Sequence, residues 1–278
     1  MSVVEVERGD GPVILGQPHG GLSVPEALRA ELNETGLALA DTDWHIGRLY
    51  DGLLPSATVV RATFHRYVID ANRDPAQVSL YPGQNTTGLC PLTDFDGRPL
   101  HRDGFAPDAA ETARRLEEFH APYHRALAAE IERVRARHGV AVLYDCHSIR
   151  STIPFLFEGR LPLFNIGSND GATCDGRLQD AVAGVCREAV AAETDWDTAL
   201  NGRFKGGWTT RTYGRPADGV HAIQMELGQR GYMDESPPWS WRAERADRLR
   251  PWLGRILAAL DELARSGALE PQQRRAER

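Results

Sequence analysis

The sequence predicts an α/β fold built on a central sheet that is mixed or mostly parallel. Short apolar runs that suit buried strands recur along the chain, and amphipathic stretches of helical length lie between them. This alternation is typical of α/β proteins. The chain has 278 residues, of which 41% are hydrophobic and 26% charged, so it can build the core that such a fold requires.

The predicted strands are short and separated by turn-forming or amphipathic segments. The clearest is the buried run VAVLY at residues 140–144. We expect the strand at 13–15 to lead directly into the segment QPHGG, and the strands at 58–60 and 67–69 to be neighbours. The last predicted strand covers residues 221–227.

Capping residues and helix breakers set the predicted helices. A first helix begins near Pro25, with Ser23 as its N-cap. In the long amphipathic stretch 107–138, we expect Pro122 to divide the helix and Gly139 to end it. The remaining helices are predicted at residues 42–54, 177–193 and 240–266.

Three long segments, residues 74–105, 148–175 and 196–219, fit no regular element and are rich in Gly, Pro, Asn, Asp or Thr. Loops of this length are usually functional or disordered. The aromatic residues within them favour ordered loops that wall a pocket over mobile excursions. Because neither a repeat nor a linker is recognisable, we predict one α/β domain over residues 1–267 and a frayed polar tail over 268–278.

Charge and composition argue against several classes of protein. The chain carries 32 basic and 39 acidic residues and a net charge of −7, which argues against nucleic acid as its main partner. Neither a membrane span nor a signal peptide is recognisable, and the four cysteines contain no CxxC pair, so we expect a reduced, cytoplasmic protein. The chain has no GxGxxG after a strand, Walker loop, HExxH or GxSxG motif.

Two histidines stand at the ends of predicted strands, where ligand sites of α/β sheets lie. His19 follows the first strand, and His147 closes the strand VAVLYDCH. They form a candidate metal-binding pair; the alternative is two unrelated loop histidines. Because side chains alternate along a strand, Asp145 and His147 share one face, whereas Cys146 faces the other way as a packed core thiol.

A hydrolytic zinc site normally has three protein ligands and one open position. The third ligand here should be a carboxylate, and Asp43 and Glu26 are the candidates. Either could instead be a charge that complements a helix N-terminus. We favour Asp43 and leave Glu26 open.

An Asn-Arg pair follows the predicted strand at 67–69. Arginine offers a planar fork to a carboxylate and asparagine adds an amide donor, so Asn72 and Arg73 are candidate substrate-binding residues. Asp70 would then orient the arginine. The alternative is a structural ion pair between Arg73 and either Asp70 or Asp74.

Glu226 lies near the end of the predicted strand HAIQMELG. It shares one face of this strand with Gln224, whereas Met225 and Leu227 share the other. A carboxylate on an otherwise apolar strand suits a general base next to metal-bound water. The alternative is a surface glutamate on an edge strand.

These residues lie within an ordered set of segments: PHGG, TDWHIGRLYD, HRYVIDANRDP, LYPGQNTTGLCP, YDCHSI with IPFLFEGRLP, GRFKGGWTTRTYG and HAIQMELGQRGYMDE. Together they resemble the N-formylglutamate amidohydrolase (N-formylglutamate deformylase) family over residues 10–260. The resemblance implies a three-layer α/β/α fold of the zinc-carboxypeptidase type. It also implies hydrolysis of N-formyl-L-glutamate to formate and L-glutamate, the last step of a histidine-degradation route.

A more distant resemblance, to zinc carboxypeptidases and aspartoacylases, implies a role for each candidate residue. It implies two metal ligands, an Asn-Arg pair that binds a carboxylate, and a catalytic base, which match in order His19 and His147, Asn72 and Arg73, and Glu226. Those enzymes carry a ligand glutamate three residues after the first histidine, where this chain has Leu22. The third ligand therefore stays open between Asp43 and Glu26.

The resemblance implies a divalent ion, preferably Zn²⁺ with Co²⁺ as a substitute, and a small anionic N-acyl amino acid as the partner. A second anionic group on that substrate calls for a further cation. Lys205, Arg203 and Arg211 are available in the segment GRFKGGWTTR, whose glycines and Trp208 suit a lid. The rival functions are hydrolysis of another N-acyl amino acid and noncatalytic binding of such compounds.

Overall fold

The computed structural model describes residues 2–78 and 83–269. Residues 79–82, which include part of the segment LYPGQNTTGLCP, and residues 270–278 lie outside this description. The described chain forms a seven-stranded sheet with the order β1-β3-β2-β4-β7-β5-β6. The strands are β1 (Val4–Glu7), β2 (Val13–Gln17), β3 (Thr58–Ala62), β4 (Ala141–Ile149), β5 (Phe164–Gly167), β6 (Thr198–Leu200) and β7 (Val220–Gly228).

The four consecutive strands β3, β2, β4 and β7 pair in parallel and bring their carboxyl ends to one edge of the sheet. β1 and β5 pair antiparallel with their neighbours β3 and β7. The register of β4 with β7 sets Asp145 beside Gln224 and His147 beside Glu226. Because side chains at these positions point to the same face, polar residues of two strands meet near this edge.

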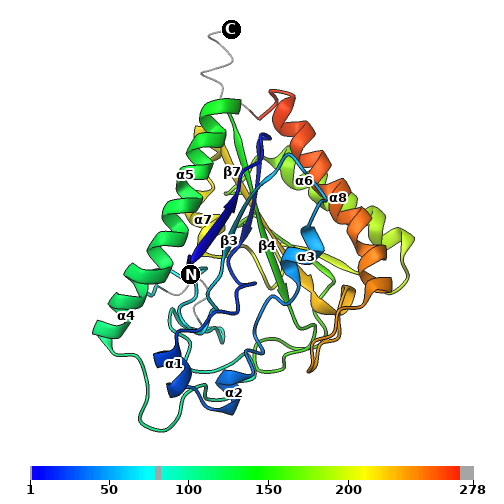
Figure 1. Ribbon diagram of the computed structural model, residues 1–278. Coiled ribbons are helices and arrows are strands. Elements are labelled where there is room, and N and C mark those ends of the chain that lie inside the picture. Colours follow the sequence, from blue (N-terminus) through cyan, green and yellow to red (C-terminus); the bar gives the residue numbers. More distant parts are fainter. Residues whose placement is uncertain (1, 79–82, 270–278) are drawn as a thin grey trace.

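Helices cover both faces of the sheet and complete three layers (Figure 1). Alternate residues of β4 divide between two cores: Ala141 and Leu143 pack on the side of α5, whereas Val142, Tyr144 and Cys146 pack on the side of α6 and α8. The predicted α/β fold and the packed core position of Cys146 are confirmed. The helices are α1 (Glu26–Glu31), α2 (Glu34–Leu37), α3 (Ile46–Tyr50), α4 (Ala109–Arg115), the π-helical turn η1 (Leu116–His120), α5 (Ala121–His138), α6 (Gly176–Ala192), α7 (Trp208–Tyr213), the 3₁₀ turns η2 (Pro216–Asp218) and η3 (Gln229–Gly231), and α8 (Ala243–Arg265).

Four of the five predicted strands are confirmed, and the one at 67–69 is wrong. The chain turns there instead, and the backbone N–H of Val68 donates to the carbonyl of His65 over 2.9 Å. The short strands β1, β5 and β6 were not predicted. β5, β6 and α7 lie inside the segments 148–175 and 196–219, which are therefore more regular than their composition indicates. Strands of three or four residues are too short to display a clear alternation.

Two predicted helix starts are wrong. α1 begins after Pro25, which is its N-cap, whereas Ser23 pairs with a neighbouring segment: its N–H donates to Thr63 and its carbonyl accepts from His65. The helix predicted over 42–54 shrinks to α3. His45, immediately before α3, has a left-handed φ of 61°, which a right-handed helix does not accommodate.

Pro122 does not break the long helix. The π-helical turn η1 joins α4 to α5, and the N–H of Ala121 donates to the carbonyl of Leu116. Pro122, which has no N–H to donate, then lies in the first turn of α5. Gly139 ends the helix as predicted, with a φ of 77° and its N–H on the carbonyl of Arg135.

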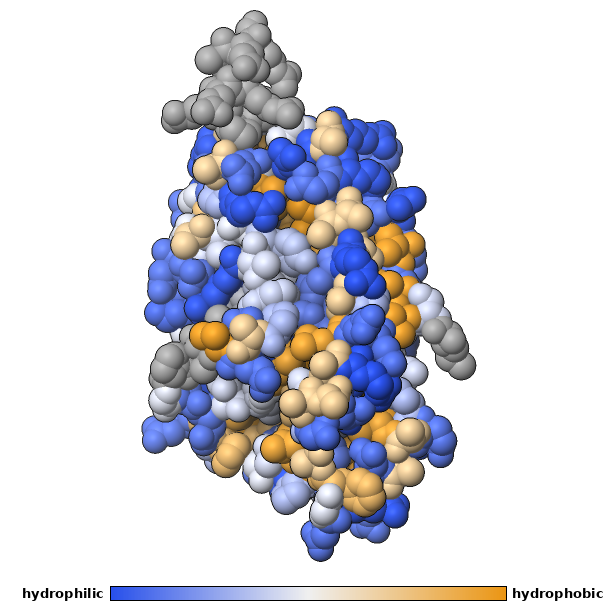
Figure 2. All heavy atoms as spheres, turned by 90° about the vertical axis from the view of Figure 1, so that its left-hand side faces the viewer, coloured by the Kyte–Doolittle hydropathy of each residue, from blue (hydrophilic) through white to orange (hydrophobic). Residues whose placement is uncertain are grey.

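The second residue of the predicted polar tail is packed. Leu269 is buried in the core, and its carbonyl accepts from Nε2 of His221 over 3.2 Å; residues 270–278 of this tail lie outside the described residues. Among the described helices, none is long and apolar enough to cross a membrane. The outer surface on the side of α5 carries hydrophilic side chains interspersed with smaller apolar patches (Figure 2).

The two glycines Gly139 and Gly254 should respond oppositely to alanine. Gly139→Ala is expected to lower the free energy of unfolding by about 1–2 kcal/mol, the cost of a left-handed L-residue. Gly254 lies inside α8, where an added Cβ meets nothing within 4 Å, so Gly254→Ala should raise it by about 0.5–1 kcal/mol. Urea unfolding followed by circular dichroism measures both effects, and a loss of stability in both variants would contradict this account.

Candidate active site

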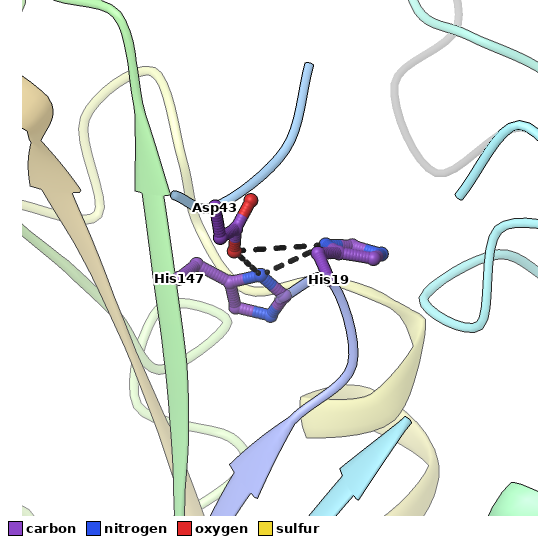
Figure 3. A group of neighbouring side chains, drawn as sticks. All are labelled: His19, Asp43 and His147. Carbon is purple, nitrogen blue, oxygen red and sulfur yellow. Dashed lines mark hydrogen bonds and ion pairs between the residues drawn. The ribbon is translucent and has the colours of Figure 1, made fainter. Parts of the chain in front are cut away.

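Three buried side chains from distant parts of the chain converge beyond the carboxyl ends of β2 and β4 (Figure 3). His19 follows β2, Asp43 lies in the loop before α3, and His147 is on β4. The Nδ1 atoms of the two histidines are 3.2 Å apart. Oδ2 of Asp43 lies 3.3 Å from Nδ1 of His147 and 3.9 Å from Nδ1 of His19.

This donor set fits a divalent metal ion. Tetrahedral Zn²⁺ with bonds of about 2.0–2.1 Å needs ligand atoms roughly 3.3 Å apart, close to the separations observed. The other ring nitrogen of each histidine is held by a buried carboxylate: Nε2 of His19 donates to Asp70 over 2.7 Å, and Nε2 of His147 to Asp145 over 3.0 Å. Such carboxylate–histidine pairs fix the ring and the tautomer of metal ligands.

The two histidines differ in protonation. Burial, assisted by the charge of Arg66, lowers the pKa of His19 to about 4, so its ring is neutral. Its Nδ1 carries a lone pair, which the guanidinium of Arg66 contacts and which a bound metal ion would take over. Burial also disfavours the charged form of His147, but Asp145 and a hydrogen bond to Asp43 raise its pKa well above the ordinary value. A metal ion that binds here must displace that proton.

Of the two carboxylates left open as third ligand, the structure brings only Asp43 to the histidines. The backbone N–H of Asp43 donates to the carbonyl of His19 over 3.1 Å, and its Oδ2 accepts from the N–H of Ser148 over 3.2 Å. Glu26 is exposed in the first turn of α1. Leu22, at the position of the glutamate ligand of the distant relatives, is 48% exposed.

Glu226 lies on β7 next to His147 of β4. Together with His19 and His147 it lines a cavity at this edge of the sheet. Nε2 of Gln224 donates to its Oε2 over 3.1 Å. Because β7 lies between β4 and β5, Glu226 is not on an edge strand. Burial raises the pKa of Glu226 from 4.5 to about 7, which suits a group that exchanges a proton near neutral pH.

Asn72 and Arg73 belong to a β-turn closed by the N–H of Arg73 on the carbonyl of Asp70, 3.2 Å away. Oδ1 of Asn72 accepts from the N–H of Thr209, and Nε of Arg73 donates to the carbonyl of Thr87. The guanidinium of Arg73 comes no closer than 3.8 Å to the carboxylate of Asp70. Asn72 and Arg73 both line the cavity.

Arg66 lines this cavity as well, although the sequence motifs pointed to no function for it. Its guanidinium contacts Nδ1 of His19 and lies 3.5 Å from Oδ1 of Asp43. Arg66 could have been identified from its place in the sequence. It lies a few residues after a predicted strand and six before Asn72, where residues of a site at the strand ends are expected. The wrong strand at 67–69 hid that signal, because Arg66 in fact begins a turn.

The three cations predicted in the segment GRFKGGWTTR occupy different places. Arg203 lines the cavity. Lys205 pairs with Asp170 over 3.0 Å, and Nε of Arg211 donates to the carbonyl of Gly206; neither of them lines the cavity. The described residues that do line it are His19, Arg66, Asn72, Arg73, Asn85, Thr86, Thr87, Phe95, His147, Ser148, Ile149, Leu156, Arg203, Phe204, Gly207, Gln224 and Glu226.

Comparison with known proteins identifies the family. The profile of the N-formylglutamate amidohydrolase family matches residues 11–233. The chain is 47% identical over 259 residues to the N-formylglutamate deformylase of Pseudomonas aeruginosa. This alignment covers 93% of this chain and 96% of the relative. It is 46% identical over 259 residues to the N-formylglutamate deformylase of Pseudomonas putida, which covers 93% and 95%.

Solved structures agree. The crystal structure of N-formylglutamate amidohydrolase from Ralstonia eutropha JMP134 matches with a TM-score of 0.77 at 26% identity, over 96% of this chain and 100% of that one. A gene product of Agrobacterium tumefaciens shares the fold with a TM-score of 0.70 at 21% identity, over 95% and 96% of the two chains. The chain belongs to the N-formylglutamate amidohydrolase family.

Proposed function

We propose that this chain is an enzyme that hydrolyses N-formyl-L-glutamate to formate and L-glutamate with the help of a bound divalent metal ion. The observation that carries this proposal is one cavity lined by both histidines of the His-Asp-His donor set, a buried glutamate and three arginines. The names of the Pseudomonas relatives support the choice of substrate. The family resemblance supports histidine degradation as the setting of the reaction, and the four free cysteines support a reducing compartment such as the cytoplasm.

We assign the metal ligands to His19, Asp43 and His147, and we propose Zn²⁺ as the ion, with Co²⁺ as a substitute. When bound, such an ion lowers the pKa of a coordinated water from 15.7 towards about 7 and polarises a carbonyl group. Asp70 and Asp145 orient the two histidines from behind. Three protein ligands would leave one coordination position for water or substrate, as in catalytic zinc sites.

Glu226 acts as the base in this proposal. It takes a proton from the attacking water and then delivers it to the amine that leaves as the formyl group is released. Gln224 holds the carboxylate by its donated hydrogen bond. Asp145, the other carboxylate on this face, is fully buried behind His147 and does not line the cavity, so Glu226 is the better candidate.

The arginines suit an anionic substrate with two carboxylates. Asn72 and Arg73 bind one carboxylate, and Arg203 binds the other, a role for which the sequence also offered Lys205 and Arg211. Arg66, beside the metal ligands His19 and Asp43, stabilises the negative charge that develops on the formyl oxygen. Three buried or half-buried cations around one small cavity would disfavour a neutral substrate.

Removal of the metal should abolish hydrolysis. We expect a chelator to eliminate turnover and added Zn²⁺ or Co²⁺ to restore it, and His19→Ala and His147→Ala each to lose both bound metal and activity. Metal analysis by mass spectrometry alongside a formate assay tests this. Full activity in a preparation shown to be free of metal would refute the mechanism.

Substitution of Glu226 should affect kcat more than KM. Glu226→Gln is nearly isosteric but cannot accept a proton, and positioned proton transfer contributes about 10²–10⁴-fold. We therefore expect kcat to fall at least about a hundredfold, with unchanged metal content and melting temperature. A variant that kept more than about a tenth of wild-type kcat would move the search for the base elsewhere.

The pH profile of kcat/KM should show the same group. The base works only when deprotonated, so activity rises with pH through the pKa of Glu226. Burial raises that pKa to about 7 and a bound cation lowers it, so the acidic limb should fall below about 7. Glu226→Gln should lack this limb; an unchanged limb in that variant would assign it to another group.

Arg73 should bind the substrate carboxylate through its planar, bidentate guanidinium group. Arg73→Lys keeps the charge but loses the bidentate geometry, and we expect it to weaken use of N-formylglutamate by about 1.5–3 kcal/mol. A substrate analogue that lacks the recognised carboxylate should be used as poorly by wild type and lose little more with the variant. Simple addition of the two losses would mean that Arg73 does not contact that carboxylate.

A panel of formyl, acetyl and succinyl amino acids separates the proposed reaction from its rivals. We expect turnover to be fastest with N-formylglutamate. Faster hydrolysis of another N-acyl amino acid would change the assigned substrate, and tight binding without any turnover would indicate a noncatalytic binding protein.

A further inference from the structure

Two histidines outside the cavity contact the β-turn that carries Asn72 and Arg73. Nε2 of His124, in the first turns of α5, lies 2.7 Å from the carbonyl oxygen of Ala71. Nε2 of His120, at the end of the π-helical turn η1, lies 3.1 Å from the carbonyl oxygen of Arg73. A carbonyl oxygen only accepts hydrogen bonds, so both Nε2 atoms carry the proton and donate.

Both imidazoles are buried and neutral, which leaves each with a single N–H group. Burial lowers the pKa of His124 to about 3 and also lowers that of His120. The hydroxyl of Tyr213 lies 3.1 Å from Nδ1 of His124 and 3.2 Å from the carbonyl oxygen of the same residue, so its single proton is offered to these two acceptors. The ring of Trp208 packs on both histidines, with centroids 5.3 Å and 4.7 Å away. The only N–H group of each ring is therefore directed at the turn.

The remaining contacts show how completely this turn is held. Its closing hydrogen bond runs from Arg73 to Asp70, the N–H of Asn72 donates to Oδ1 of Asp70, and the side chain of Asn72 accepts from Thr209. The carbonyls of Ala71 and Arg73 flank Asn72 and face the helix. The hydrogen bonds from His120 and His124 fix the orientation of these two carbonyls. They thereby fix the backbone from which the side chains of Asn72 and Arg73 extend.

We propose that His120 and His124 are positioning residues that hold the substrate-binding turn Ala71–Arg73 in its binding geometry by donating one hydrogen bond to the carbonyl on each side of Asn72. This inference rests on the proposed function, in which that turn binds a substrate carboxylate. The π-helical turn η1 supports it, because such turns occur frequently at functional sites and this one ends at His120.

The test compares two substitutions of His120 that differ in hydrogen bonding. His120→Leu removes the donor, whereas His120→Gln places an amide N–H near the position of Nε2. The turn binds substrate and transition state alike, so we expect His120→Leu to raise KM about 3- to 10-fold, the equivalent of one hydrogen bond, with kcat within about twofold. His120→Gln should restore KM. Bound metal should be unchanged in both.

His138→Leu serves as the matched control, because it makes the same chemical change at the other end of α5. It should leave KM unchanged even where it lowers the melting temperature. If His120→Leu does not fold, His120→Asn takes its place, since its shorter amide does not reach the Arg73 carbonyl. An unchanged KM in the variant without the donor, or a KM that Gln fails to restore, would overturn the inference.

Arg73→Lys separates failure of this inference from failure of the proposed function. If His120 acts through the turn, Arg73→Lys should raise KM less in the His120→Leu background than in wild type. A rise in KM with Arg73→Lys but none with His120→Leu would refute the positioning role alone. No rise with Arg73→Lys would instead refute the proposed binding of substrate by the turn.

Discussion

The buried carboxylate of Asp70 is the constraint on which the candidate active site depends. Its Oδ1 accepts hydrogen bonds from Nε2 of His19 over 2.7 Å and from the N–H of Asn72 over 2.8 Å. Burial disfavours its charge, but the adjacent Arg73, His19 and Arg66 hold its pKa well below the ordinary value. An ionised buried carboxylate requires its donors to stay in place, so a proposed metal ligand and the substrate-binding turn are fixed together.

The sheet supplies the rest of the geometry. The in-register pairing of β4 with β7 sets His147 beside Glu226 on one face, while alternate residues of both strands enter the apolar core on the other. The proposed ligand and the proposed base therefore share one rigid support. Loops that follow β2 and β3 bring His19, Asp43 and Arg66 to the same edge.

The sequence could predict strand-borne residues because the alternation of side chains along a strand is a local property. His147 and Glu226 were placed on the correct faces for this reason. The loop-borne residues depend on long-range contacts that no local pattern displays. The sequence favoured Asp43 but left Glu26 open, because the position of Asp43 rests on a hydrogen bond from its backbone N–H to the carbonyl of His19. Arg66 was overlooked because its turn resembled a strand. The sequence could not show which of Arg203, Lys205 and Arg211 lines the cavity, because the path of their loop depends on contacts with the rest of the fold.

The proposed mechanism depends on a metal ion bound between His19, Asp43 and His147. Anomalous diffraction at the zinc absorption edge, from crystals of the zinc-loaded protein, tests it most directly. We predict one strong peak within about 2.0–2.2 Å of Nδ1 of His19, Nδ1 of His147 and a carboxylate oxygen of Asp43. A peak elsewhere in the protein, or one bound through the Nε2 atoms now held by Asp70 and Asp145, would contradict this account.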